Sequence, residues 1–149
     1  MGISYDIFTE TFLDKISEYK FGRIGEFERM TTVDGYMKRA ISAFKKICKY
    51  DLTTTADDVV REFYVEVDKA DMDELVDIIT EGMVVQWLKP YAFSGDNLEL
   101  GINTRDFQRT SAAEILMRIN NVYNDARKNF KFMMRDYSYN HGDLTDLHL

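Results

Sequence analysis

The sequence predicts a mainly α-helical fold, a helical bundle of about four helices with a long C-terminal helix. Three observations support this prediction. Apolar residues recur every three or four positions in four separate segments. The chain has only eight glycines and one proline, so helix breakers are few, and its 45% apolar residues can form a core. At 149 residues we expect one helical domain over residues 1–137 and an extended C-terminal arm over residues 138–149.

Two amphipathic helices are expected in the first fifty residues. The first runs from an N-cap at Ser4 to about Lys20, with one apolar stripe of Phe8, Phe12, Ile16 and Tyr19. The second runs from about Val33 to Lys49, and its apolar stripe is Met37, Ala40, Ile41, Phe44, Ile47 and Cys48. Because no histidine precedes the C-terminal tail, we expect Cys48 to be a small buried hydrophobic residue.

The middle of the chain predicts a small β-hairpin and then a third helix. Residues 51–58 are polar and β-branched, and Glu62–Val67 partly alternates, which favours a hairpin within residues 51–67. The third helix is expected from Asp71, paired with Glu74 in a capping box, to Pro90. Its apolar stripe is Met72, Leu75, Val76, Ile79, Met83 and Trp87. Residues 91–110 are expected to form a long loop, and loops of that length are usually functional or disordered.

The fourth helix has the clearest signal. Ser111–Glu114 fits a capping box, and a heptad-like seam continues to Tyr137 through Leu116, Ile119, Tyr123, Ala126, Phe130 and Met133. A helix from Ser111 to Tyr137 would be about 40 Å long at 1.5 Å per residue. We therefore expect one end to project from the bundle or to pack on another subunit.

Charge and motifs exclude several classes of protein. The net charge is −7, and residues 51–81 carry eleven acids against two bases, which argues against a free-standing DNA-binding protein. The acids from Asp68 to Glu81 do not have EF-hand spacing, so we expect an acidic first turn followed by a solvated helix face. A hydrolase using Asp71 and Asp73 with a divalent cation is the enzymatic alternative.

No motif for catalysis, a cofactor or a metal is found. The sequence has no Walker loop, HExxH, GxSxG or paired-cysteine motif, and the histidines and acids from His141 to His148 match no zinc or calcium spacing. We therefore expect no enzyme, no cofactor and no metal. Neither a signal peptide nor a membrane span is expected, because no apolar run approaches 18 residues.

Four segments, taken in order, resemble the small head–tail connector proteins (neck, adaptor or head completion proteins) of tailed bacteriophages. These segments are Gly82–Pro90, Leu100–Phe107, Ser111–Leu116 and Tyr137–Leu144. The resemblance is strongest over residues 75–144, and order and spacing carry it. It implies a structural virion protein without catalytic residues, assembled in the host cytoplasm and located in the head–tail neck.

The resemblance also implies partners. A homo-oligomeric ring, often twelvefold, would sit beneath the portal protein, extend the DNA channel and dock the next neck or tail protein. Genomic double-stranded DNA would pass through the ring without tight binding, and no membrane is involved. The C-terminal arm would reach a neighbouring ring.

Two groups of residues are candidates for these contacts. The interface candidates are aromatic or belong to the closing segment: Trp87, Phe107, Tyr137, Tyr139, His141, Gly142, Asp143, Leu144 and Leu147. The acidic candidates, expected to line the lumen or face a basic neighbour, are Asp57, Asp58, Glu62, Glu66 and Asp68. Two alternatives stay open: a tail-terminator or stopper protein of the same machine, and a small cytoplasmic helical regulator that binds a partner helix through the heptad seam.

Overall fold

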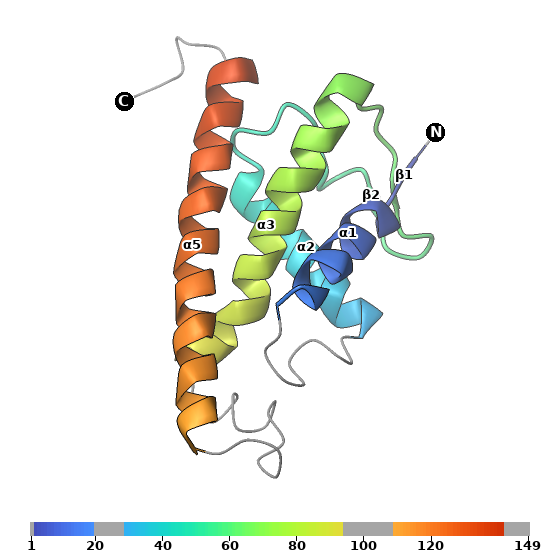
Figure 1. The fold of residues 1–149 in the computed structure, drawn as a ribbon. Coiled ribbons are helices and arrows are strands. Elements are labelled where there is room, and N and C mark those ends of the chain that lie inside the picture. The colour runs from blue at the N-terminus through green and yellow to red at the C-terminus, as the bar shows by residue number, and fades with distance from the viewer. Residues whose placement is uncertain (1, 20–28, 94–108, 142–149) are drawn as a thin grey trace.

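The structure, a computed structural model, describes residues 2–19, 29–93 and 109–141, with side chains in the last range from Glu114 onward. Its described part is mainly helical and has a small sheet, which confirms the predicted fold class (Figure 1). The elements in order are β1 (Ile3–Ser4), α1 (Asp6–Ser17), α2 (Met30–Phe44), β2 (Ala56–Asp57), β3 (Glu62–Phe63), α3 (Lys69–Phe93) and α5 (Arg109–His141). Both α1 and α2 end earlier than the apolar pattern indicated.

Helix α3 is the centre of the bundle. It packs against α5 on one side and against α1 and α2 on the other (Figure 1). From Ile78 to Val85 every residue is buried, so this helix has no solvated face there. A helix that is enclosed on all sides buries more than one stripe. The expectation of a solvated acidic face is therefore wrong for Glu81, which is buried and forms an ion pair with Lys15 of α1.

Gly82 permits the close approach of three helices. A Cβ atom at this position would lie 2.8 Å from the Cβ of Ala40 on α2 and 2.8 Å from the ring of Phe130 on α5. Real Cβ atoms do not approach other atoms so closely, and the small residues therefore set the spacing of α2, α3 and α5. Gly82 lies in the first of the segments that resemble the connector proteins, and here its role is packing.

The start of α3 differs from the prediction. The carbonyl of Asp68 accepts the N–H groups of Asp71 and Met72 at 2.9 and 3.1 Å, so the helix begins at Lys69. The carboxylate of Asp71 accepts the hydroxyl of Tyr50 at 2.5 Å, and this hydroxyl in turn accepts the Asp68 N–H at 3.4 Å. The predicted capping box of Asp71 with Glu74 is wrong, because the tyrosine hydroxyl occupies that carboxylate.

The end of α3 also differs from the prediction, because the helix continues through Pro90 to Phe93. A proline removes its own N–H donor and disturbs the carbonyl four residues earlier, here that of Gln86. In the last turn few further bonds depend on that position, so the helix tolerates the loss. Residues 91–93 and 109–110 are helical and do not belong to the predicted loop of residues 91–110; residues 94–108 lie outside the described range.

Helix α5 has 33 residues and is therefore about 50 Å long. Its predicted seam is confirmed as core-facing, with Ile119, Tyr123, Ala126, Phe130 and Tyr137 buried in the common core with α3. At the start of the seam Ile115 is buried in place of Leu116, which is only half-buried. The first turns of α5 extend beyond the last turn of α3 (Figure 1).

The arm predicted from residue 138 is wrong over its first four residues. Residues 138–141 continue α5, because His141 packs on Tyr137 with ring centroids 4.4 Å apart and hydrogen-bonds Glu74 of α3 at 2.7 Å. These contacts attach the last turn of α5 to α3. Residues 142–149 lie outside the described range.

The sheet has strand order β1-β3-β2, and both pairings are antiparallel. Phe63 pairs with Ile3 on one side and with Ala56 on the other. The hairpin predicted within residues 51–67 is confirmed, although its second strand is limited to Glu62–Phe63. Strand β1 was not expected, because Ser4 was interpreted as a helix cap; its Oγ does accept the N–H of Asp6 at 3.1 Å.

Candidate functional site

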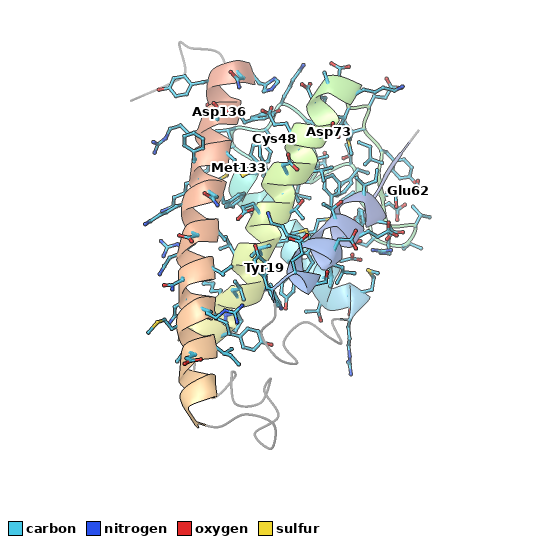
Figure 2. The ribbon with its side chains drawn as sticks, viewed as in Figure 1. Tyr19, Cys48, Glu62, Asp73, Met133 and Asp136 are labelled. Carbon is cyan, nitrogen blue, oxygen red and sulfur yellow. The ribbon has the colours of Figure 1, made fainter. Side chains whose placement is uncertain are left out.

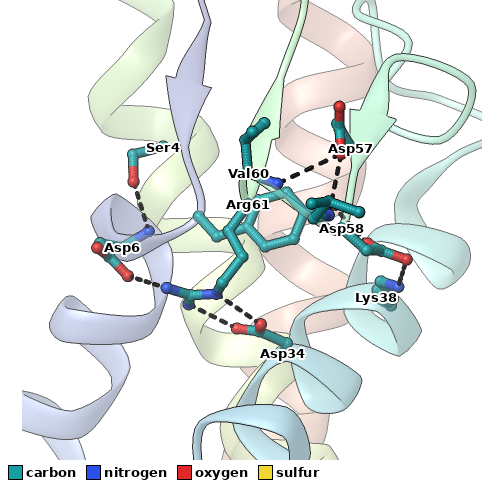
Figure 3. Close-up of polar contacts among 10 residues, drawn as sticks. Ser4, Asp6, Asp34, Lys38, Asp57, Asp58, Val60 and Arg61 are labelled. Atoms are coloured by element: carbon teal, nitrogen blue, oxygen red, sulfur yellow. Dashed lines mark hydrogen bonds and ion pairs between the residues drawn. The ribbon is translucent and has the colours of Figure 1, made fainter.

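The turn between β2 and β3 is built on Arg61, the one non-glycine residue with positive φ (56°) in the described part of the chain. Its guanidinium makes a bidentate contact with Asp34 of α2, from Nε at 2.8 Å and from Nη2 at 2.9 Å. Nη1 donates to Asp6 of α1 at 2.7 Å (Figure 3). One side chain therefore joins the sheet to the starts of both helices.

The backbone and ring of Tyr5 complete this arrangement. The Tyr5 N–H donates to the Arg61 carbonyl at 2.9 Å, and the guanidinium carbon lies 5.7 Å from the centroid of the Tyr5 ring. A left-handed backbone costs an ordinary residue about 1–2 kcal/mol, which these contacts offset. The hydrogen bonds that Arg61 donates to Asp34, and then that to Asp6, raise the pKa of the guanidinium above its already high value. We call Arg61, Asp34 and Asp6 the arginine clamp.

Two aspartates shape the turn itself. Asp57 Oδ1 accepts the N–H of Val59 at 2.9 Å and that of Val60 at 3.4 Å, which closes an Asx turn. Asp58 accepts Lys38 Nζ at 2.5 Å and the Tyr5 hydroxyl at 2.7 Å, and these bonds, that of Lys38 first, lower the pKa of Asp58. Burial, followed by the bond to Asp58, raises the pKa of Tyr5.

These polar contacts hold an exposed apolar pair of residues at the end of the turn. Val59 is 92% exposed and Val60 52% exposed, and we call these two residues the valine tip. Tyr64, just after β3, is 56% exposed. Exposed apolar residues on a backbone that is already fixed lose little conformational entropy when they meet a partner. The geometry is that of a preformed contact point.

The acidic candidates have different places and partners. Asp57 and Asp58 hold the turn, and Glu62 pairs in the sheet at its base. Glu66 is exposed on the segment that leads to α3, and Asp68 caps that helix through its carbonyl. Asp57, Asp58 and Glu62 are therefore the acidic candidates of the turn, whereas Asp68 belongs to the start of α3.

Two of the aromatic interface candidates are core residues. Trp87 is 0% exposed, with its ring 6.1 Å from that of Phe12 and 6.4 Å from that of Tyr19. Tyr137 is 0% exposed, and its hydroxyl accepts the Lys49 N–H at 3.0 Å. Neither side chain has surface for a partner, so the assignment of these two residues to an interface is corrected.

The remaining interface candidates separate into two groups. Tyr139 is 46% exposed on α5 and is available for contact, whereas His141 is occupied by Glu74 at 2.7 Å. Phe107, Gly142, Asp143, Leu144 and Leu147 lie outside the described residues.

The described residues contain no group of three or more histidine, cysteine, aspartate or glutamate side chains with the geometry to hold a metal ion. Asp71, named in the enzymatic alternative, is bound by Tyr50 and lies 3.8 Å from Lys49 Nζ. Cys48 is half-buried against the core beside a cavity of about 250 Å³, and burial raises the pKa of its thiol. A raised pKa disfavours the reactive thiolate.

The arginine clamp was missed by the sequence reading. Its signal was present, because Arg61 is the single base among the four acids of residues 57–66. Nothing in the spacing, however, identifies Asp6 and Asp34 as its partners, since they lie 55 and 27 residues away. Positive φ at a non-glycine residue has no sequence signature either.

In the described part of the chain, every helix is too short or too polar to cross a bilayer. Comparison with known proteins gives no relationship: no family model matches the chain, and no curated protein or solved structure is similar to it.

Proposed function

We propose that this chain is a structural virion protein that forms a homo-oligomeric ring in the neck of a tailed bacteriophage. The ring joins the portal to the next neck or tail component and extends the DNA channel. The placement in the neck rests on the order of the four segments that resemble head–tail connectors. The structural observation that carries the role in assembly is the valine tip, 92% and 52% exposed on a base of ion pairs.

A structural role accords with the way the tip is built. An exposed apolar pair is a liability for an isolated protein, and a non-glycine residue with φ of 56° is a further cost. A subunit can tolerate the exposed valines and the positive φ if assembly covers the tip.

The other candidates have less support. A regulator that binds a partner helix through the heptad seam would have to separate α5 from α3, because the seam is buried between them. A tail-terminator or stopper protein would share every feature described above. Its position along the neck, next to the tail tube instead of the portal, distinguishes it.

Purified phage particles test the proposal directly. Quantitative mass spectrometry is expected to find this chain in a fixed ratio to the portal protein, and cryo-electron microscopy is expected to find it as a ring at the portal vertex. A phage in which the gene carries an early stop codon is expected to accumulate DNA-filled heads and separate complete tails. Absence of the chain from particles that infect normally would overturn the proposal.

A further inference from the structure

The outer face of α5 has a composition opposite to that of the valine tip. Residues 127–135 contain four bases and no acid: Arg127, Lys128, Lys131 and Arg135. All four are exposed, and none of the ion pairs among the described residues involves them. Arg127 lies over the ring of Tyr123, with its guanidinium carbon 5.6 Å from the centroid.

Phe132, which is 67% exposed, lies among these bases. Met117, 65% exposed, precedes them by ten residues on α5, and Tyr139, 46% exposed, follows them by four. Arg127, Lys131 and Arg135 follow each other at four-residue steps, and Phe132 lies about 100° around the helix from Lys131. We call the four bases with Phe132 the basic face of α5. Phe132 lies at the edge of this face. It is one turn from Lys128 and Arg135 on α5, and it lines a groove with Asp136 of α5 and with Asp73 and Asp77 of α3.

The tip and the basic face lie on opposite sides of the subunit. Figure 1 places α5 along one edge of the bundle and the β2–β3 turn at the other edge, with α3 between them. In Figure 2, Glu62 at the base of the turn is far from Met133 and Asp136 on α5. One subunit cannot bring its own tip and its own basic face together.

We propose that the valine tip of one copy docks on the basic face of α5 of the next copy. Val59 and Val60 would pack on Phe132, while the acids of residues 57–66 meet the bases of residues 127–135. Asp58 is already paired with Lys38, and Arg61 is held in the arginine clamp. The acids that would meet the four bases of the second segment are therefore Asp57, Glu62 and Glu66. This inference deepens the proposed function and rests on its ring.

The contact is heterologous, because each copy offers its tip to one neighbour and its basic face to another. Such a contact leaves one free tip and one free face on every growing chain of subunits, and it ends only when a ring closes. A second copy is favoured over an unrelated basic partner because the complementary surface is present on this same chain.

Cysteine cross-linking tests the contact in the full-length protein. In a Cys48→Ala background, the double variant Val59→Cys with Phe132→Cys is purified and oxidised at high protein concentration. A ladder that continues beyond the dimer is expected on a non-reducing gel. The control pair, Val59→Cys with Ala43→Cys, uses an exposed position on α2 and is expected to give at least tenfold less product.

Mixing single-cysteine variants tests the polarity of the contact. Val59→Cys protein mixed with Phe132→Cys protein is expected to give the mixed dimer, and each alone is expected to stay monomeric. Dimers of Val59→Cys alone would mean a two-fold contact between tips and would overturn the proposal. If the mixture and the double variant both remained monomeric after oxidation, the proposal would also be overturned.

Charge reversal separates a specific contact from collision. In the double-cysteine variant, Lys131→Glu with Arg135→Glu is expected to reduce the ladder at least tenfold, and Glu62→Lys with Glu66→Lys is expected to restore it. Lys46→Glu, which changes an exposed base just after the end of α2, is the matched control and should leave the ladder intact. Circular dichroism melting of each variant identifies any that fail to fold; failure of restoration in folded variants contradicts the proposal.

These outcomes are independent of the test on particles. If the protein gave the cross-linked ladder but were absent from virions, the tip-to-α5 contact would be supported and the location in the neck would be rejected. A protein found in the neck without the ladder would keep the neck and reject this contact.

Discussion

The centre of α3 and the β2–β3 turn are stabilised by different forces. Around α3, buried apolar side chains and close helix approach at Gly82 determine the structure. In the turn, two valines remain exposed while Arg61, Asp34 and Asp6 hold the backbone by charge-assisted hydrogen bonds. High salt concentration and low pH weaken ion pairs but affect hydrophobic packing much less. The comparison indicates that buried apolar contacts determine the fold, whereas the turn holds exposed apolar side chains in a position where a partner could contact them.

The strongest challenge to the core is Gly82→Ala. We expect a loss of about 3 kcal/mol in the free energy of unfolding, because the added methyl group would meet Ala40 and Phe130 in a packed junction. Urea denaturation measures it. The matched control is Gly35→Ala on α2, where nothing lies within 4 Å, and a gain of up to about 1 kcal/mol is expected from helix propensity. Equal effects of the two substitutions would contradict the role assigned to Gly82.

The turn is challenged by replacing Arg61. Arg61→Ala is expected to cost about 2 kcal/mol, since it leaves the half-buried carboxylate of Asp34 unpaired. Arg61→Gly is expected to be milder by about 1 kcal/mol, because glycine adopts positive φ without strain. Denaturation gives both values, and limited proteolysis at the tip reports local opening. An Arg61→Ala protein as stable and as protease-resistant as the wild type would show that the clamp does not hold the turn.

The core also contains a polar atom, the hydroxyl oxygen of Thr9, which allows its hydrophobic character to be tested. Thr9 is fully buried, and its hydroxyl has no hydrogen-bond partner among the residues that the structure describes. Thr9→Val replaces that hydroxyl by a methyl group of similar size and is expected to stabilise the fold by about 1 kcal/mol. Thr9→Ser, which keeps the hydroxyl and removes a methyl group, is expected to destabilise it. Thermal melting of both proteins is sufficient, and a destabilised Thr9→Val variant would mean that the hydroxyl has a partner.

The smallest expected effect is the loss of stability at high pH that comes from Tyr5, which packs on the core and also contacts the turn. Burial and Asp58 raise the pKa of Tyr5 above its usual value near 10, so its contribution to stability is complete below pH 10 and is lost as the pH rises further. We expect Tyr5 to account for about 0.4 kcal/mol of lost stability at pH 10. Denaturation between pH 8 and about pH 11 should show a shallower decline for Tyr5→Phe than for the wild type. Parallel declines would contradict this assignment.

The same division explains how much the sequence could predict. The stripes of α1, α2 and α5 follow directly from helical periodicity, because burial on one face leaves a repeating pattern. Helix α3 was only partly predicted, since enclosure on all sides removes the contrast between faces on which such predictions depend. Its ends were misjudged because Tyr50 occupies Asp71 and because the last turn tolerates Pro90.

The candidate site was less predictable than the fold. The acids around the turn were identified from composition, but Arg61, which organises them, was not. Its partners lie on separate helices, and only the folded chain brings them together. Trp87 and Tyr137 were proposed as contacts because large aromatic residues are enriched at interfaces, yet the same residues also fill cores. Composition alone does not distinguish these two locations.

Strand β1 has a consequence for the order of folding. It pairs with β3, whose Phe63 stands 60 positions later in the chain than its partner Ile3. The ribosome must therefore have released residues beyond 63 before the first helix can be fixed in place by the sheet. Contacts of such long sequence separation form slowly because a large loop must close first. During synthesis α1 therefore emerges before the strand that completes the sheet at its start.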